Sequence, residues 1–356
     1  MSKTGPVLVY QIGSLGDTIV SIPCYRALRR HFKGREIRLL QAQLAPGRVV
    51  PSDMLIRENL IDGVVSYKHK SAGSGLMEKL EVWKSVFGAK PSCAVYIGPA
   101  ERPPAVVARD KKFFRSCGIG SLVGFHGIDY APFRVRDPDG NLPRMPHQSR
   151  LRMERLALDG VDIRETDFST PLLHPSQEER EAAIDWLDAH RTLKGKKLFM
   201  VGVGSAQPCT AWPFEYFRKL GELITGSGLA EIVVVGGPAE RESGEQLVAA
   251  WGQGSVAAGQ FDVHQMAALL SQADLYAGLD TGTTHLAAAV GTSVIGIYSD
   301  HNQPGEWEPM GSGHTILTHR VPCQGCRTLQ CQTEGHPCMA GITPEQVFTA
   351  IQTRLA

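Results

Sequence analysis

The chain has 356 residues, of which 42% are hydrophobic and 21% carry a charged side chain. This length favours two domains, each with a hydrophobic core of its own. No stretch approaches the roughly 20 apolar residues of a membrane-spanning helix, and the first residues lack the apolar core of a signal peptide. We therefore expect a cytoplasmic protein, with peripheral contact at the inner face of the membrane as an open alternative.

The net charge of +1 is spread unevenly along the chain. Residues 1–150 hold 23 Lys and Arg against 12 Asp and Glu, whereas residues 151–356 hold 14 against 24. A basic half is typical of a surface that meets an anionic partner, such as a phosphorylated acceptor or a membrane surface. A solvated surface without a partner fits the pattern equally well. We expect no nucleic-acid polymer as a partner.

The first half alternates short apolar runs with helical patterns, which predicts a parallel sheet covered by helices on both faces. The predicted strands are 6–12, 36–43, 63–67, 93–97 and 121–125, and the predicted helices are 18–32, 76–88, 105–117 and 147–158. Residues 131–146 are rich in Pro, Asp and Arg and are predicted to form a loop near the mouth of the site.

A glycine-rich turn joins the first strand to the first helix. It contains Gly13, Ser14 and Gly16 and lacks the full dinucleotide-binding fingerprint. Asp17 follows near the helix N-terminus, where the helix dipole favours a carboxylate that can accept a proton. Asp is also a common helix cap. On these residues alone, capping is the favoured role for Asp17.

The alternation resumes in the second half after a linker near 165–195. Its predicted elements are helix 176–190, strand 198–203, helix 213–226, strand 231–235, helix 239–251, strand 255–257 and helix 263–271. A last helix, 343–356, begins with Thr343 as its cap and Gln346 completing a capping box. We expect an acceptor-side domain over 1–170, a connecting helix over 171–189 and a nucleotide domain over 190–340.

Residues 274–298 form the most informative stretch. A strand ends at Asp280, Thr281 and Gly282, a short helix starts with Thr283, Thr284 and His285, and 294–298 is a second buried strand. The unpaired N–H groups at such a helix start attract phosphate. The alternative is an ordinary β–α–β unit with a threonine cap.

Two more turns follow strands of the second domain. One offers Ser205 and Gln207, and the other ends at Glu240, which could bind a ribose diol. Ligands bind at the carboxyl ends of parallel strands, so three such turns favour a nucleotide. Phe261 could flank the base, although a place in the core is the commoner fate of an aromatic side chain.

Four cysteines are spaced C-x2-C-x4-C-x6-C near the C-terminus, at Cys323, Cys326, Cys331 and Cys338. In a cytoplasmic protein this spacing favours a metal over disulfides, with zinc or iron as the candidates. The alternatives are replacement of a cysteine ligand by a nearby histidine, and reduced cysteine without metal. The nearby histidines are His314, His319 and His336. We expect the remaining cysteines to be small packing residues: Cys24, Cys93, Cys117 and Cys209.

Together these motifs resemble the heptosyltransferase family of glycosyltransferases, over nearly the whole chain. The resemblance rests on 12–17 followed by Pro23, on Trp212–Pro213, on 236–240 and, most specifically, on 280–289. It implies an α/β fold of the GT-B type, with two facing Rossmann-like domains. It also implies transfer of a heptose from ADP-heptose with inversion and no cofactor for catalysis. Some members carry a similar cysteine cluster, which holds iron in some of them.

The resemblance also implies a role for each matching residue. Asp17 matches the catalytic base, on the acceptor side. Asp280, Thr281, Gly282 and His285 match positions that hold the donor's phosphates and sugar. The other matches are Glu240 with the ribose, Phe261 with the adenine, and Ser205 and Gln207 with the pyrophosphate.

One residue departs from the family pattern. The family commonly has a lysine where this chain has Thr210, two residues before Trp212. A hydroxyl carries no charge to stabilise the leaving diphosphate. The acceptor stays open between lipopolysaccharide core, a protein hydroxyl and a small natural product. Two rival interpretations are a sugar-nucleotide epimerase or hydrolase of the same fold, and a non-catalytic or altered-donor relative.

Overall fold

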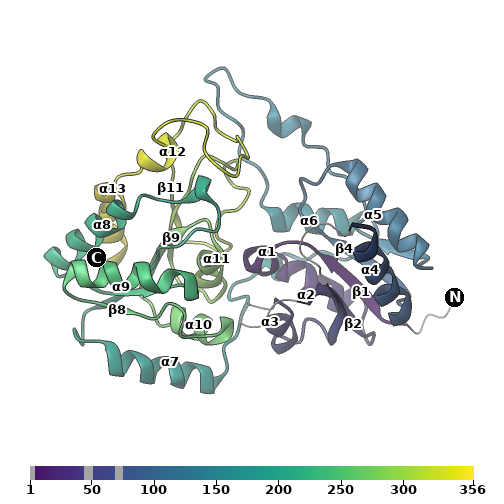
Figure 1. The fold of residues 1–356 in the computed structure, drawn as a ribbon, viewed down its shortest axis with the longest axis horizontal. Coiled ribbons are helices and arrows are strands. Elements are labelled where there is room, and N and C mark those ends of the chain that lie inside the picture. Colours follow the sequence, from purple (N-terminus) through teal and green to yellow (C-terminus); the bar gives the residue numbers. More distant parts are fainter. Residues whose placement is uncertain (1–4, 44–50, 69–74) are drawn as a thin grey trace. The chain divides into compact units, whose positions relative to one another are not determined.

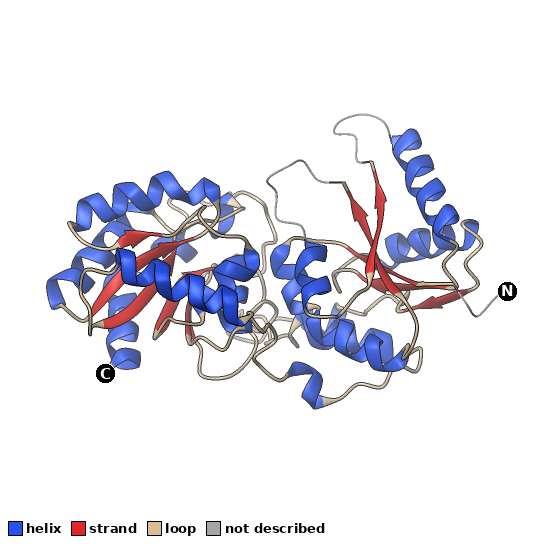
Figure 2. Cartoon of the chain, turned by 90° about the horizontal axis from the view of Figure 1, so that it is seen from below, coloured by secondary structure: helices blue, strands red, loops and turns tan. Residues whose placement is uncertain are grey.

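The computed structural model describes residues 5–43, 51–68 and 75–356. The first four residues, on which part of the signal-peptide prediction rests, lie outside the described residues. The chain divides into two compact units (Figure 1). Unit 1 comprises Met1–Pro132 and Pro146–Phe168, and unit 2 comprises Phe133–Met145 and Ser169–Ala356. The α/β fold with two parallel sheets is confirmed, and helices flank the strands of each unit (Figure 2).

The sheet of unit 1 has five parallel strands in the order β3-β2-β1-β4-β5. They are β1 (Val7–Gln11), β2 (Ile37–Ala42), β3 (Gly63–Tyr67), β4 (Cys93–Ile97) and β5 (Ser121–Val123). Every residue of β4 is buried, as expected for a strand covered on both faces. The central pair is β1 and β4, so the turn after β1 lies where the strand order reverses.

The helices of unit 1 are α1 (Leu15–Val20), α2 (Ile22–His31), α3 (Pro51–Arg57), α4 (Gly75–Ala89), α5 (Pro104–Ser116) and α6 (Gln148–Ala157). The single helix predicted over 18–32 is thus two helices that meet at Ser21. Pro23 has no N–H to continue the first helix, and the Ser21 hydroxyl donates to the Asp17 carbonyl at 2.8 Å. Helix α3 was not predicted.

The sheet of unit 2 has six parallel strands in the order β11-β10-β9-β6-β7-β8. They are β6 (Lys197–Gly202), β7 (Ala230–Val235), β8 (Ser255–Val256), β9 (Leu275–Leu279), β10 (Val294–Ile297) and β11 (Thr315–Leu317). The edge strand β11 was not predicted, because three half-buried residues give no measurable pattern.

The helices of unit 2 are α7 (Gln177–His190), α8 (Phe214–Ser227), α9 (Arg241–Trp251), α10 (Val263–Leu270), α11 (Gly282–Ala289), α12 (Pro337–Ala340) and α13 (Pro344–Leu355). The predicted capping box of α13 is confirmed. Thr343 Oγ1 accepts from Gln346 N at 3.3 Å, and Gln346 Oε1 accepts from Thr343 N at 2.8 Å. Among the described residues, no helix is both long and apolar enough to span a bilayer.

The segment 133–145, predicted as a loop, packs within unit 2. Leu142 N donates to Gln324 Oε1 at 2.9 Å, and Met145 N donates to the carbonyl of Pro304 at 2.8 Å. Trp212 anchors another irregular segment, because its buried Nε1 donates to the Ile342 carbonyl at 2.9 Å. These bonds hold the turns at the carboxyl ends of the unit 2 strands.

Candidate functional site

Three turns of unit 2 meet at one edge of its sheet. In the parallel register Gly202 pairs with Gly278 and with Val235, so β6, β7 and β9 end at the same level. Strands β6 and β9 are neighbours at the centre of the sheet, where the strand order reverses. This is the position at which open parallel sheets bind ligands. As expected from the sequence, the turns after 202, 235 and 279 lie on one side.

The turn after β9 carries Asp280 into the first turn of α11. Asp280 Oδ1 lies 3.6 Å from His285 Nε2, and Asp280 Oδ2 accepts from Asn302 Nδ2 at 3.2 Å. His285 is only 3% exposed, and its Nδ1 has no hydrogen-bond partner within the described part of the chain. A buried polar nitrogen without a partner is costly. A bound ligand would satisfy it.

The backbone at the start of α11 presents free donors. The first helical hydrogen bond runs from His285 N to the Thr281 carbonyl at 3.3 Å, so the preceding N–H groups have no intrahelical acceptor. The Thr281 side chain makes no capping bond. The buried Thr284 hydroxyl instead contacts the Leu279 carbonyl and the hydroxyl of Tyr276, which lies 3.1 Å away. Thr284 therefore fixes the helix start to β9.

The turn after β6 is closed by its own hydroxyl groups. Ser205 Oγ and Thr210 Oγ1 lie 2.6 Å apart, and both donate to the Gln207 carbonyl, at 2.8 and 3.1 Å. Thr210 is 5% exposed. The Thr210 hydroxyl, at the position where the family commonly has a lysine, therefore makes its hydrogen bonds within the turn.

Glu240 connects the turns after β6 and β7. Its Oε2 accepts from Gly237 N at 2.7 Å. A Cβ placed on Gly204 would lie 2.3 Å from Glu240 Cγ, so only glycine at 204 leaves room for this side chain. The Glu240 side chain, which is predicted to bind the ribose, is therefore packed against the turn that contains Ser205.

Phe261, the residue predicted to pack on the adenine, follows shortly after Gly259, whose N–H donates to the carbonyl of Gly236 in the turn after β7 at 3.0 Å. Phe261 itself lies just before α10. Its ring packs edge-on against Trp186 of α7, with centroids 5.7 Å apart. Its adenine-packing role stays a prediction.

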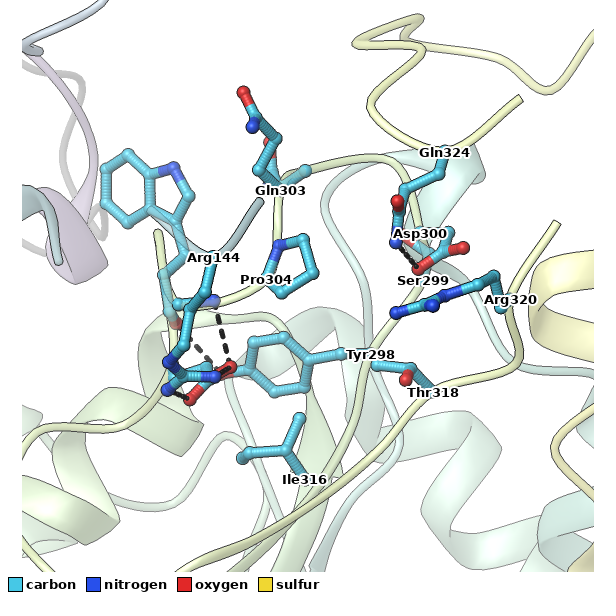
Figure 3. Close-up of a pocket in the computed structure, with 14 residues that line it drawn as sticks. Arg144, Tyr298, Ser299, Asp300, Gln303, Pro304, Ile316, Thr318, Arg320 and Gln324 are labelled. Carbon is cyan, nitrogen blue, oxygen red and sulfur yellow. Dashed lines mark hydrogen bonds and ion pairs between the residues drawn. The ribbon is translucent and has the colours of Figure 1, made fainter. Parts of the chain in front are cut away.

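A cavity of about 340 Å³ in unit 2 was not found from the sequence (Figure 3). Tyr298 and Trp307 line it together with Asn302, the residue that bonds Asp280. Arg144 forms an ion pair with Glu308 at the rim, and Arg320 reaches in from the opposite side (Figure 3). These residues come from irregular segments, whose sequence carries no periodic signal.

In unit 1, Asp17 sits in the first turn of α1, and both of its carboxylate oxygens are engaged. Oδ2 accepts from Ser14 N at 3.0 Å, which completes a capping box. Oδ1 accepts from Arg152 Nη2 at 2.9 Å. Gly13 adopts φ +131°, and a Cβ there would lie 2.1 Å from Asp17 Cγ, so glycine is required for the carboxylate to fold back over the turn. Gly16 is buried in the same turn.

Arg152 of α6 is a site residue that sequence reasoning missed. Its side chain is fully buried, whereas that of Asp17 is 17% exposed. Besides the carboxylate, the guanidinium donates to the Asp17 carbonyl at 3.0 Å and to Ser21 Oγ at 2.6 Å. One arginine therefore fixes both the carboxylate and the helix that carries it. An arginine on the apolar face of a predicted helix was the available signal.

Arg155 is a second buried arginine, one turn further along α6. Its Cζ lies 4.5 Å from the centroid of the Tyr96 ring, and its Nη2 donates to the Gly98 carbonyl. Burial lowers the pKa of Arg155 to about 10. The loops after β1 and β4 are thus both fastened to α6.

The predicted metal-binding cysteines of unit 2 surround one small cavity of about 10 Å³. Lining it are Cys209, Cys323, Cys326, Cys331, Cys338, His301 and His336. Cys209, expected to be a packing residue, is buried and also lines this cavity. Within the described residues, however, no three such groups are close enough together to hold a metal ion. His314 and His319 contact other groups, at Val294 and Gly341.

Two Rossmann-like units, each with a polar turn where its strand order reverses, define a glycosyltransferase fold of the GT-B type. The sequence profile of glycosyltransferase family 9 (heptosyltransferase) matches residues 155–336. The chain belongs to this family.

Two curated relatives are lipopolysaccharide heptosyltransferases. Lipopolysaccharide heptosyltransferase 1 from Pseudomonas aeruginosa is 27% identical over 158 residues, which cover 40% of this chain and 44% of that protein. Lipopolysaccharide heptosyltransferase 2 from Salmonella typhimurium is 22% identical over 217 residues, which cover 58% of this chain and 62% of that protein. The matches therefore span about half the length of these relatives.

Three solved structures share the fold. A family 9 glycosyl transferase from Veillonella parvula has a TM-score of 0.72 at 20% identity and covers 100% of this chain and 98% of that one. The E. coli heptosyltransferase WaaC with ADP has a TM-score of 0.61 at 17% identity, with coverages of 98% and 99%. The iron-containing dodecameric glycosyltransferase TibC from E. coli has a TM-score of 0.55 at 13% identity, with coverages of 99% and 76%.

Proposed function

We propose that this chain transfers a heptose from ADP-heptose to an acceptor hydroxyl, with inversion at the anomeric carbon. The observation that carries the proposal is the start of α11, where open backbone donors adjoin Asp280 and the buried, unpartnered Nδ1 of His285. Family membership and the ADP bound by WaaC support a nucleotide-sugar donor.

In this proposal the donor's diphosphate lies over the N-terminus of α11. The N–H groups of Gly282 and Thr283 and the positive end of the helix dipole stabilise the charge that develops as ADP departs. His285 Nδ1 contacts a phosphate or sugar oxygen. Ser205 and Gln207 approach the pyrophosphate from the turn after β6, and Glu240 accepts hydrogen bonds from the ribose diol. Phe261 packs on the adenine.

Asp17 is the proposed general base. The acceptor oxygen attacks the anomeric carbon, the bond from that carbon to the phosphate oxygen breaks, and the acceptor's proton passes to the Asp17 carboxylate. A carboxylate is a weak base towards a free alcohol, so proton transfer occurs late, when the forming bond has acidified the hydroxyl. The Arg152 contact supports this role by fixing the position of Asp17.

The acceptor is proposed to be an anionic or hydroxylated molecule, in keeping with the basic first half of the chain. A lipopolysaccharide core is the first choice, because both curated relatives are named for that substrate. Protein hydroxyls and small natural products are the other classes to assay. The proposed reaction takes place in the cytoplasm, with peripheral contact at the membrane where the acceptor is a lipid.

We also propose that Cys323, Cys326, Cys331 and Cys338 bind one zinc or iron ion. The chemistry of the donor set fits, because sulfur and imidazole ligands around one small cavity suit these metals. Bound metal would cross-link the C-terminal segment and would take no part in the transfer.

Calorimetry with ADP and ADP-heptose tests the donor site. Asp280→Ala and His285→Ala should each weaken binding about 10-fold or more, since hydrogen bonds to charged groups contribute about 1.5–3 kcal/mol. Asp262→Asn is the matched control, because Asp262 caps α10 of the same unit through Gln265 N. Wild-type affinity in both site variants would contradict the proposal. Tight binding of a different nucleotide sugar would reassign the donor.

A further inference from the structure

Helix α4 of unit 1 carries large apolar side chains on two of its faces. Val82 and Val86 lie on the core face and pack in the same cluster as Val65 of β3. Leu80 and Phe87, seven residues apart, share a different face of the helix and are 50% and 51% exposed. Apolar residues on a protein surface are usually scattered singly. Two large ones on one helix face therefore indicate a contact surface.

Trp83 extends this face towards α5. Its ring stacks on that of Phe87, with the centroids 4.7 Å apart and 10° between the planes. Its Nε1 donates to the Ser116 carbonyl at the end of α5 at 3.2 Å, so the two helices lie side by side (Figure 1). Leu80, Trp83 and Phe87 together form one apolar strip, in which α5 fixes the orientation of the central ring.

Exposed basic side chains flank the apolar strip at both ends and on α5. They are Lys79 and Lys90, beside the first and last members of the strip, and Lys112 near the end of α5. None of these lysines has an ion-pair partner in the part of the chain that the structure describes. The segments 75–90 and 104–116 together hold seven Lys and Arg against three Asp and Glu. The surface around the strip is therefore positively charged.

The charge selects among the partners that could cover the apolar strip. A second copy of the chain, docked through the same surface about a two-fold axis, would bring like charges together. Lysine is also depleted at protein–protein interfaces. An aromatic and aliphatic strip with lysines at its rim is instead typical of surfaces that bind anionic lipid.

We propose that this surface of α4 and α5 docks unit 1 on a bilayer that contains anionic lipid. Leu80, Phe87 and the exposed edge of Trp83 enter the headgroup region, and the flanking lysines contact lipid phosphates. The inference deepens the proposed function, because it names the surface and the lipid charge for the membrane contact expected with a lipid acceptor. The core face of α4 stays packed on the sheet, so docking needs no unfolding and is reversible.

Vesicle flotation tests this surface on the full chain without donor or acceptor. Wild type should bind vesicles of phosphatidylcholine and phosphatidylglycerol. Vesicles of phosphatidylcholine alone should bind about 100-fold more weakly, since each of three lysines near an anionic surface contributes about 5-fold. Raised salt should release the protein from the anionic vesicles, because it screens these charges.

Substitutions then locate the contact. Phe87→Ser and Leu80→Ser should each weaken binding to the anionic vesicles about 10-fold or more, because an exposed apolar side chain no longer leaves water. Lys79→Gln combined with Lys112→Gln should weaken it about 10-fold or more. Ile184→Ser is the control, at an apolar residue of α7 in unit 2 that is 45% exposed, and should bind as wild type does. The substituted side chains are exposed, and urea unfolding checks that each variant is folded.

No vesicle binding by wild type, or equal binding by wild type and the strip variants, would overturn the inference. So would equal binding to vesicles with and without phosphatidylglycerol. A wild-type dimer in analytical ultracentrifugation that Phe87→Ser dissociates would also overturn it, because the strip would then join two copies. Failure of the proposed function looks different: if no form releases ADP from ADP-heptose while Phe87→Ser still loses vesicle binding, the membrane surface stands without the transfer.

Discussion

At the scale of single residues, Asp17 has two roles that use different oxygens. Oδ2 caps α1 through Ser14 N, and Oδ1 faces the buried guanidinium of Arg152. Capping and catalysis were alternatives in the sequence, but the geometry allows both. The two roles are separable, because asparagine can cap a helix but cannot accept the acceptor's proton.

Asp17→Asn should therefore abolish transfer and leave the fold and donor affinity intact. Loss of a general base costs about 10²–10⁴ in rate, whereas the free energy of unfolding should fall by no more than about 3 kcal/mol, because the buried Arg152 guanidinium loses its charged partner while the helix cap is kept. Single-turnover rates with ADP-heptose, urea unfolding and ADP calorimetry check the three parts. A wild-type rate would leave Asp17 as a helix cap only.

Arg152→Met should destabilise unit 1 and lower the turnover number. Removing one partner of a buried ion pair costs about 3–5 kcal/mol, here reduced by the partial exposure of Asp17 to about 3 kcal/mol. Donor affinity in unit 2 should not change. Arg164→Met, in an exposed pair with Asp162, is the control. Similar unfolding free energies for the two variants would show that the Arg152 pair is not a positioning contact.

Thr210→Lys tests the departure from the family at one side chain. The Thr210 hydroxyl is held within its turn, so a lysine would lose that bond but would add a cation beside the proposed pyrophosphate. We expect ADP to bind several-fold tighter, since a partly exposed charge pair contributes about 1 kcal/mol. Weaker ADP binding would mean that another basic side chain already fills this role beside the pyrophosphate.

At the scale of elements, His314 holds the start of β10. Its Nδ1 accepts from Val294 N at 3.2 Å, and its Nε2 lies 3.1 Å from the Met310 carbonyl, so the ring is neutral in this arrangement. Burial lowers the pKa of His314 below its usual value of 6.5. Burial lowers the pKa of His301 in the same way.

This predicts an acid-sensitive unit 2. The unfolded chain takes up protons near pH 6.5 while the folded imidazoles resist them, so stability present above pH 6.5 is lost as the pH falls towards the lowered folded values. Urea unfolding should give a smaller free energy of unfolding at pH 5.0 than at pH 7.5. His314→Gln should reduce the loss, because a glutamine side chain does not take up a proton. Identical losses of stability in wild type and in His314→Gln would contradict the assignment of the acid sensitivity to His314.

The elements also show what the sequence could predict. Long alternating runs gave both sheets, most helices and the capping box of α13, since these depend on local periodicity and caps. The break at Ser21, helix α3 and strand β11 were missed. Arg152, the 340 Å³ cavity and the place of Cys209 depend on contacts between residues far apart in the chain, which no local pattern records.

At the scale of the whole molecule, the charge asymmetry is partly neutralised, because some of the basic side chains form ion pairs inside unit 1. Arg30 pairs with the buried Asp167, Arg102 with Asp110, and Arg152 with Asp17. The remaining excess of Lys and Arg over acids in residues 1–150 still gives this half a positive field. Raised ionic strength should therefore weaken the binding of an anionic acceptor more than it weakens the binding of ADP-heptose.

The central claim is that the chain transfers heptose from ADP-heptose with Asp17 as the base. Its most direct test is a time course of ADP release from ADP-heptose, with and without lipopolysaccharide core, a protein acceptor pool or small hydroxylated acceptors. Mass spectrometry of the acceptor accompanies it. The account predicts acceptor-dependent ADP release, an acceptor heavier by one heptose, and neither with Asp17→Asn. Release of ADP without acceptor and without a glycosylated product, unchanged in Asp17→Asn, would contradict it.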